Sequence, residues 1–270
     1  MIPKLLRRKL DSRRVNFTIN SQILGLNPVE DVEQFIQRLL PKDYGHSLIR
    51  LGGRGDGGYL VPDDLVGISA CYSPGSAGSW KFEKELWEIF EIPSYICDTK
   101  DQMPSDLDSS QTFSDGWVGP SNQAGFFTLD TWISKEHQGS QELILQMDIE
   151  GAEYLTLLAT SEELLKRFRI MVIEFHHFEG IKNLHAFRLL YEPLFARILE
   201  IFDVVHLHPN NCCGSWDFGT TSFPTVLELT FHRKNRRRSE GTHCHLPNKL
   251  DEKNSESGDE IVVRWPRGKS

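Results

Sequence analysis

Residues 143–177 read LILQMDIEGAEYLTLLATSEELLKRFRIMVIEFHH, and this segment carries the strongest signal of the fold class. It contains two short apolar runs, 143–145 and 170–173, which are separated by a segment of good helix formers. Apolar runs of this length, joined by a helical pattern, are typical of buried parallel strands connected by a crossover helix. The sequence therefore predicts two neighbouring strands of a parallel sheet.

Ionisable residues follow both predicted strands. Asp148 and Glu150 come after the first apolar run, and Glu174 and His176 come at the end of the second. In open parallel sheets the ligand site lies just beyond the carboxyl ends of the strands. We therefore expect these four side chains to face one crevice.

Composition excludes several classes of protein. The chain has 270 residues with 39% apolar content, which is ordinary for one globular core. Residues 21–232 carry 14 basic and 31 acidic residues, and a body this acidic argues against a nucleic-acid-binding face. No apolar stretch reaches the roughly 18 residues of a membrane span, and the five cysteines lack the spacing of a disulfide framework. We expect a soluble, cytoplasmic protein without a nucleic-acid partner.

The chain divides into three predicted parts. Residues 1–45 form an arm followed by a helix that begins near Pro28 and ends at Pro41. Residues 46–232 form an α/β domain, which opens with a glycine-rich hairpin over residues 48–61. Residues 233–270 are polar, lack apolar periodicity, and are expected to be disordered.

Within the α/β domain, apolar periodicity and turn residues predict the remaining elements. A Rossmann-like, seven-stranded and mostly parallel sheet with an antiparallel last strand is the expected architecture. The predicted segments are strands at 67–73, 95–97, within 99–125, at 201–208 and at 226–231, helices at 80–90 and 184–200, and a turn at 209–214.

A turn of small residues, Tyr72-Ser73-Pro74-Gly75-Ser76-Ala77-Gly78, lies between the first core strand and its helix. Such a turn lets a nucleotide-like ligand lie against its backbone and the helix N-terminus. Asp98 ends the next strand about twenty residues later, the spacing at which an acid accepts hydrogen bonds from ribose hydroxyls. The pattern predicts a nucleotide-like cofactor on this turn.

These features resemble the class I methyltransferase fold, which binds S-adenosylmethionine. More narrowly, the segments 129–132 (LDTW), 147–153 (MDIEGAE) and 173–176 (IEFH) are similar to the FkbM family of methyltransferases. The resemblance covers about residues 50–232. The turn 72–78 departs from the Asp-x-Gly-Ala-Asn-x-Gly form of that family and is closer to a subgroup that reads Tyr-Ser-x-Gly.

The resemblance implies transfer of a methyl group from S-adenosylmethionine to a hydroxyl oxygen on a small metabolite, sugar or polyketide. It places the cofactor beside the turn and Asp98, with Asp148 facing both cofactor and acceptor. The segment His208-Pro209-Asn210-Asn211 is similar to a subgroup feature on the substrate side. The implied cofactor-binding residues are Tyr72, Ser73, Gly75, Ser76, Gly78, Asp98 and Asp148, and the implied substrate-binding residues are His208, Asn210 and Asn211.

Transfer to a hydroxyl oxygen requires removal of its proton. Histidine suits this task near neutrality, and His176 follows the fifth strand beside the carboxylates that end the fourth. We therefore predict that His176 is the general base, that Glu150 or Glu174 orients it, and that Asp148 completes the catalytic group.

Three other functions fit parts of the pattern. An NAD(P)-dependent oxidoreductase also needs a glycine turn and an acid after the second strand, although it prefers three spaced glycines. A catalytically inactive scaffold would keep the fold alone. A metal-binding module would use His206, His208 and the cysteines 212–213, but these lack the paired spacing of a closed zinc site, and no metal site is predicted.

Overall fold

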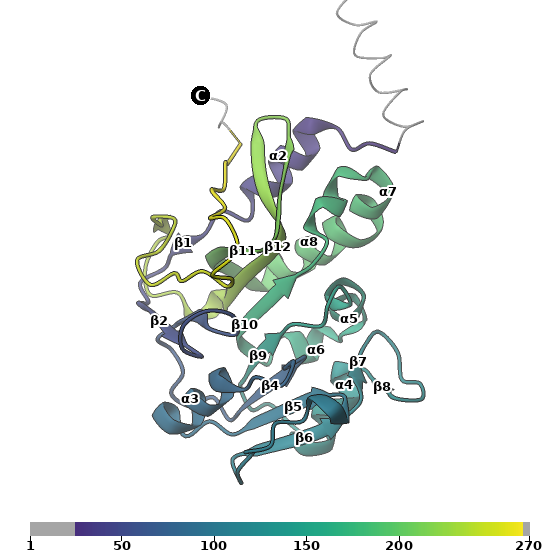
Figure 1. The fold of residues 1–270 in the computed structure, drawn as a ribbon, viewed down its shortest axis with the longest axis vertical. Coiled ribbons are helices and arrows are strands. Elements are labelled where there is room, and N and C mark those ends of the chain that lie inside the picture. The colour runs from purple at the N-terminus through teal and green to yellow at the C-terminus, as the bar shows by residue number, and fades with distance from the viewer. Residues whose placement is uncertain (1–24, 267–270) are drawn as a thin grey trace, which may run out of the picture.

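A seven-stranded sheet runs through the computed structural model, which describes residues 25–266 (Figure 1). Within it β4, β5, β6, β9 and β10 are parallel, and β12 runs antiparallel to its neighbours β10 and β11. The strands across the sheet are β11 (Phe202–Phe218), β12 (Thr221–Arg233), β10 (Phe168–Phe175), β9 (Leu143–Met147), β4 (Ala70–Pro74), β5 (Ser94–Asp98) and β6 (Gln111–Asp115). The predicted sheet is confirmed.

The strand order reverses between β4 and β9. From β4 the chain proceeds outward to β5 and β6 on one side, and it then returns to build β9 and β10 on the other. The connections after β4 and after β9 therefore run to opposite sides of the sheet. This divergence opens a crevice beyond the carboxyl ends of β4 and β9. The predicted glycine turn follows β4, and Asp148 follows β9, so both lie at this reversal.

Strict alternation along the central strands creates two cores. Leu143 and Leu145 face a large core, whereas Ile144 between them faces a smaller one. In β10 the same division separates Met171 from Val172. Because each strand is buried on both faces, it reads as an unbroken apolar run instead of an alternating one.

Helices cover the two faces unequally. The large core packs against α2 (Val29–Gln37), α4 (Leu129–Glu136), α5 (Glu153–Ala159), α6 (Glu162–Leu165) and α8 (Glu192–Ile201). The smaller core lies under α3 (Lys81–Phe90) and the hairpin of β2 (Leu48–Leu51) and β3 (Tyr59–Pro62). The short elements are β1 (Lys42–Asp43), β7 (Trp117–Val118), β8 (Phe126–Phe127), β13 (Thr242–His243), η1 (Lys100–Gln102), η2 (Phe178–Lys182) and η4 (Lys234–Arg236).

The helix predicted over residues 184–200 is present and has an irregular middle. It begins as α7 (Leu184–Ala186), continues as a π-helical turn, η3 (Phe187–Tyr191), and ends as α8. Pro193, in the first turn of α8, has no N–H to donate to the preceding turn. The π-helical turn directly precedes this proline, where regular i to i−4 hydrogen bonding is interrupted.

The turn predicted at residues 209–214 is wrong. Strand β11 continues through this segment to Phe218, with a bulge between Asn210 and Ser215, before the chain reverses at residues 219–220. The adjacent Cys212 and Cys213 form a disulfide within this bulge. The Pro-Asn-Asn-Cys-Cys-Gly pattern therefore marks extra residues inserted into a strand, which carry the same turn-forming composition as a loop.

The C-terminal segment, 234–266, has little regular structure but lies against the body beside β11 and β1 (Figure 1). Arg237 donates two hydrogen bonds to Asp203, at 2.6 and 2.5 Å, and the Trp265 ring packs edge-on against Phe223. This placement differs from the expectation of a disordered tail. Its contacts are mostly single polar ones, and such contacts leave no apolar periodicity in the sequence.

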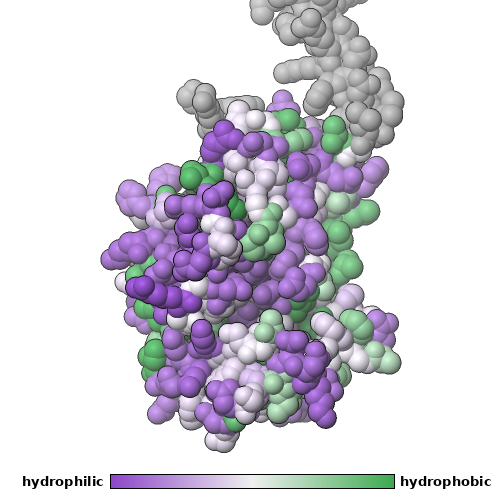
Figure 2. Space-filling model, viewed as in Figure 1, coloured by the Kyte–Doolittle hydropathy of each residue, from purple (hydrophilic) through white to green (hydrophobic). Residues whose placement is uncertain are grey.

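The visible face of the molecule is largely hydrophilic, with apolar residues in scattered spots (Figure 2). Among residues 25–266, no helix is both long enough and apolar enough to cross a membrane. The predicted N-terminal arm lies mostly outside the described residues, and the domain boundaries remain a prediction.

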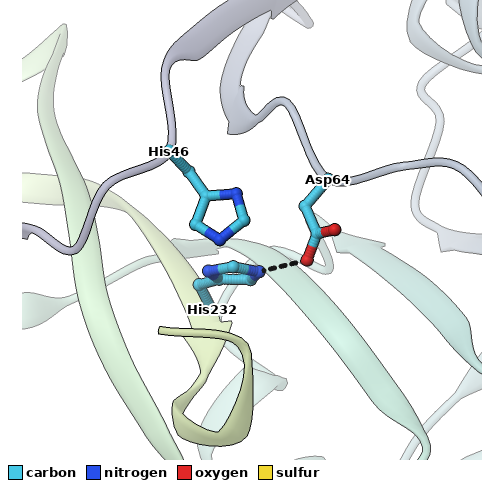
Figure 3. A group of neighbouring side chains, drawn as sticks. All are labelled: His46, Asp64 and His232. Carbon is cyan, nitrogen blue, oxygen red and sulfur yellow. Dashed lines mark hydrogen bonds and ion pairs between the residues drawn. The ribbon is translucent and has the colours of Figure 1, made fainter. Parts of the chain in front are cut away.

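A group of buried and partly buried polar side chains, here called the Arg-paired cluster, lies near the amino end of β10, at the opposite strand ends from the crevice. It consists of His46, Asp64 and His232 (Figure 3). The His232 Nε2 atom lies 3.0 Å from Asp64 Oδ2, and Arg236 donates to both Asp64 oxygens at 2.6 and 2.7 Å. Burial favours a raised pKa for Asp64, but the hydrogen bonds from Arg236 and His232 outweigh it and hold this pKa at about 2.

This cluster joins the loop after β3 to the end of β12, and we predict that Asp64→Asn destabilises the fold. The substitution leaves the partly buried Arg236 without a carboxylate and removes one of the two carboxylates that pair with the buried Arg169. Removing one partner of a buried ion pair costs about 3 to 5 kcal/mol. For a protein of this size that loss should lower the melting temperature by roughly 6 to 15 °C in a thermal unfolding scan.

Asp217→Asn is the matched control. Asp217 also pairs with an arginine, Arg264, but its side chain is 72% exposed, so solvent screens the interaction. Its melting temperature should stay close to that of the wild type. Equal melting temperatures for the two variants would contradict a structural role for the Arg-paired cluster.

Candidate functional site

The turn after β4 and the loop after β9 touch through their backbones. The Asp148 N–H donates to the Pro74 carbonyl at 3.1 Å, and Gly75 has a φ of +82°. A Cβ placed on Gly75 would lie 1.5 Å from the Asp148 carbonyl oxygen, which no side chain tolerates. Gly75 is therefore required by the contact between the two loops as well as by its left-handed conformation.

Polar side chains replace apolar ones at the carboxyl ends of the central strands, on the face that carries the smaller core. In β9 the alternation runs from Ile144 through Gln146 to Asp148, and in β10 it runs from Val172 to Glu174. Because side chains two residues apart share a face, the same alternation that builds the core also aims these groups into the crevice. Glu228 in β12 lies opposite Glu174 in β10 and extends the polar surface.

Asp148, Glu174 and His176, here called the acid–His cluster, converge at the end of this surface. The His176 Nε2 atom lies 3.8 Å from Asp148 Oδ1 and 3.7 Å from Glu174 Oε1. The exposed Glu150 carboxylate is 3.4 Å from the same nitrogen. The structure thus brings together all four predicted catalytic residues.

Glu153 holds both the loop and the imidazole. Its buried carboxylate lies 3.1 Å from His176 Nδ1 and accepts hydrogen bonds from the N–H groups of Ile149 and Gly151 at 3.2 and 3.0 Å. With Nδ1–H donating to Glu153, the Nε2 atom faces the other carboxylates. The orienting contact to Nδ1 therefore comes from Glu153, whereas the sequence analysis assigned orientation to Glu150 or Glu174.

The pKa values of all three residues in the acid–His cluster are raised above their usual values. Burial raises the pKa of Asp148 to about 7, with the positive charge of His176 opposing the shift and Glu150 adding to it. Burial raises the pKa of Glu174 to about 10, and the charges of Asp148 and Glu228 act in the same direction. For His176 burial disfavours the charged form, but the hydrogen bond with Glu153 and the neighbouring carboxylates outweigh it and raise the pKa.

Asp98, the acid predicted to contact the ribose of the cofactor, lies beneath the glycine turn and is buried. Its Oδ2 atom accepts hydrogen bonds from the N–H groups of Ser76 and Ala77 at 2.9 and 3.0 Å, and its Oδ1 atom accepts one from Thr99 at 2.7 Å. Asp98 therefore fixes the shape of the turn. Its Oδ1 atom keeps the capacity for a further hydrogen bond.

A cavity of about 120 Å³ opens in front of the turn, against β3 and α3. Acidic groups line it, including Glu83 and Asp148, and so does one cationic group, Lys81. The complete lining is Asp56, Gly57, Tyr59, Gly75, Ser76, Ala77, Ser79, Lys81, Phe82, Glu83, Gln146 and Asp148. A larger cavity, of about 530 Å³, lies at the other edge of the sheet beside His46 and His232, away from the crevice.

The other predicted cofactor-binding residues are divided. Ser73 is buried and does not line the cavity itself, but its hydroxyl contacts the side chains of Glu83 and Gln146, which do. The Tyr72 side chain points the other way, into the large core, where its hydroxyl lies 2.7 Å from His137 Nδ1. Gly78 lies in the turn but does not line the cavity.

The predicted substrate-binding residues serve different contacts. Asn210 donates to Glu174 Oε1 at 2.9 Å, next to the acid–His cluster. His208 lies 3.0 Å from Asn254 of the C-terminal segment, and Asn211 donates to the carbonyls of residues 255 and 258 in that segment. Asn210 therefore borders the crevice, whereas Asn211 fastens the C-terminal segment to β11.

Besides Glu153, two further site residues, Glu83 and Asn254, were not predicted from the sequence. Glu83 is buried in the first turn of α3, three residues before the buried Leu86 on the same face. An acid at an apolar position of an amphipathic helix is a signal of a buried polar site. Asn254 donates to Glu228 at 2.6 Å and to Asp56 at 3.1 Å, but its segment is 26 residues or more away in sequence and gave no signal.

Comparison with protein families supports the predicted class. Residues 126–211 match the model of the methyltransferase FkbM domain, which confirms the resemblance noted in the sequence. The matched segment begins at β8 and ends in β11, so it contains Asp148, Glu174 and His176. The match covers about a third of the chain, and it supports the predicted methyltransferase class. No curated protein matches the chain.

Two solved structures have a related arrangement of elements at 10% sequence identity. One is M. capricolum TrmK in complex with the natural cofactor product S-adenosyl-homocysteine, with a TM-score of 0.35, covering 65% of this chain and 70% of that one. The other is human methyltransferase 10 domain containing protein, with a TM-score of 0.38, covering 76% of this chain and 81% of that one. At these scores neither likeness informs the site.

We predict that Gly75→Ala disrupts the crevice. The new methyl group would overlap the Asp148 carbonyl, so the turn and the loop after β9 must separate. Breaking this contact should lower the melting temperature by several degrees more than a left-handed alanine alone, whose cost is about 1 to 2 kcal/mol. Thermal unfolding followed by circular dichroism measures the difference.

Gly125→Ala separates the two causes. Gly125 has a similar φ of +78°, but a Cβ on it would meet no atom within 4 Å. It therefore reports the conformational cost without the clash. A Gly75→Ala variant no less stable than Gly125→Ala would show that the two loops are not held in contact.

Proposed function

We propose that this protein transfers a methyl group from S-adenosylmethionine to a hydroxyl oxygen of a small metabolite or saccharide. The observation that carries the proposal is the glycine turn at the reversal of the strand order, packed directly against Asp148. Ligands of open α/β sheets bind at such a reversal. The match to the methyltransferase FkbM domain supplies the reaction class.

The cavity in front of the turn suits the amino-acid end of the cofactor. Its carboxylates, Glu83 and Asp148, would attract the methionine ammonium group, and Lys81 would attract the carboxylate. Because Glu83 is buried and contacts Ser73, it can take the place of the acid that this turn lacks relative to the usual family form. The backbone of Gly75 and Ser76 allows the cofactor to approach closely.

The ribose would lie over Asp98. Three N–H groups already hold this carboxylate in place, so it is oriented before any ligand arrives. The remaining acceptor capacity of Oδ1 would receive a ribose hydroxyl. In this proposal Asp98 has two roles, because it shapes the turn and also contacts the cofactor.

The acid–His cluster would complete the reaction. The oxygen–carbon bond forms as the carbon–sulfur bond breaks, sulfur keeps the electron pair, and the hydroxyl proton must leave. Because the pKa of His176 is raised and that of Asp148 is about 7, we assign proton removal to the pair and not to His176 alone. Asn210 and the exposed Glu150 would border the acceptor.

The charge of the crevice favours a neutral or cationic acceptor. The exposed Glu150 carboxylate borders the position for transfer, and its negative charge, with that of Asp148 above pH 7, would repel a phosphate-rich acceptor such as a nucleic acid. The competing oxidoreductase is disfavoured by the methyltransferase domain match. An inactive scaffold would bind the cofactor without turnover, which incubation of metabolite extracts with labelled S-adenosylmethionine tests.

We predict that Asp98→Ala weakens binding of S-adenosylmethionine by roughly ten- to a hundredfold, because it removes a charge-assisted hydrogen bond and loosens the turn. Isothermal titration calorimetry with the cofactor measures this change. Asp101→Ala is the control, since Asp101 is an exposed acid three residues further along the chain. Equal affinities for wild type and Asp98→Ala would remove Asp98 from the cofactor site.

A further inference from the structure

The acid–His cluster has the composition and spacing of a metal site. Asp148, Glu174 and His176 each offer one ligand atom, and these atoms all lie within 4.8 Å of one another. Two ligands that are each about 2.1 Å from one ion lie roughly 3.0 Å apart at right angles and about 4.2 Å apart when opposite. The distances from His176 Nε2 of 3.8 and 3.7 Å fall in this interval.

The imidazole is already arranged as a ligand. Metal-binding histidines usually donate their other ring N–H to a carboxylate, which fixes the ring and makes it more basic. Glu153 provides this contact at Nδ1, at 3.1 Å, and its side chain is fully buried. The Nε2 atom of His176 is thereby directed at the two carboxylates.

Two buried atoms of the cluster have no hydrogen-bond partner, Asp148 Oδ1 and Glu174 Oε2. The Glu174 side chain is only 5% exposed, and unpartnered carboxylate oxygens at that depth are costly. Among the ion pairs of residues 25–266, Asp148 and Glu174 pair only with His176, and neither pairs with Lys or Arg. A buried positive charge would satisfy both atoms.

The Arg-paired cluster shows that three close ligand atoms do not by themselves leave carboxylate oxygens without a partner. It satisfies the same criterion of three close ligand atoms (Figure 3), but Arg236 saturates its one carboxylate, Asp64, through two hydrogen bonds. A metal ion there would have to displace a guanidinium group. The acid–His cluster contains no such competitor.

We propose that Asp148, Glu174 and His176 bind one divalent cation. Two carboxylates and one imidazole form a mixed ligand set that suits Mn²⁺, whereas Mg²⁺ prefers oxygen ligands and water. Three protein ligands leave positions open for water or for an acceptor oxygen. The site is within the described residues and lies directly beside the cavity in front of the glycine turn.

One consequence rests on the proposed function. A hydroxyl bound to the cation at an open position would lose its proton more readily and would be held beside the sulfonium methyl group. His176 and Asp148 would then act as ligands in place of the base role assigned to the pair above, and the proton would pass to water or to the exposed Glu150. Methyl transfer should then stop when the metal is removed and return when Mn²⁺ is added.

Binding can be tested without any acceptor. Full-length protein is stripped with a chelator and titrated with Mn²⁺, and bound Mn²⁺ is followed by loss of the free-ion signal in electron paramagnetic resonance. The wild type should bind one Mn²⁺ per chain. His176→Asn and Glu174→Gln should each weaken binding at least about tenfold, and Glu153→Gln roughly ten- to a hundredfold through the misoriented ring.

Two controls isolate the site. His177→Asn alters the neighbouring histidine, whose side chain is 74% exposed, and His46→Ala alters the Arg-paired cluster. Both should keep the wild-type affinity. Circular dichroism checks folding, and His176→Asn alone suffices if the variants of the more deeply buried carboxylates do not fold.

Absence of Mn²⁺ binding at millimolar concentration would overturn the inference, as would wild-type affinity in His176→Asn or loss of binding in His46→Ala. A parallel titration with S-adenosylmethionine separates this result from the proposed function. Cofactor binding without Mn²⁺ binding would refute only the cation site. Mn²⁺ binding without cofactor binding would keep the cation site and refute the methyl-transfer proposal.

Discussion

The contact between Gly75 and the backbone of Asp148 is the constraint on which the candidate site depends. The two residues follow β4 and β9, which lie far apart in sequence, yet no atom larger than hydrogen fits on Gly75 where they meet. This contact puts the small-residue turn, the end of β9 and the acid–His cluster into one crevice. It also explains why a left-handed glycine follows β4, because only that conformation brings the turn across the neighbouring strand.

Charge balance distinguishes the two polar clusters of the molecule. Around Asp64 two arginines compensate the carboxylate, and the result is a structural link between β3 and β12. Among the ion pairs of residues 25–266, Asp148 and Glu174 have an imidazole as their only cationic partner. Carboxylates buried with so little compensation destabilise a fold, and proteins keep such arrangements mainly at sites that bind or react.

The sequence predicted the parts of this structure that depend on local patterns. Unbroken apolar runs identified β9 and β10, and the ionisable residues after them identified the acid–His cluster. Which acid orients His176 was not predictable from the sequence. Glu150 and Glu153 are both acids of one turn, and only the three-dimensional structure shows that Glu153 contacts His176. Asn254 was missed for a related reason, since a single polar contact from a distant segment leaves no periodic signal.

Hydrogen–deuterium exchange of the protein, with and without S-adenosylhomocysteine, directly tests where the cofactor binds. If the cofactor binds at the reversal of the strand order, the amides of residues 74–79 and 146–151 should exchange more slowly in its presence. Residues 42–48 and 243–249, which border the larger cavity, should be unaffected. Protection confined to that second region would contradict the account, because it would place the ligand at the opposite edge of the sheet from Gly75 and Asp148.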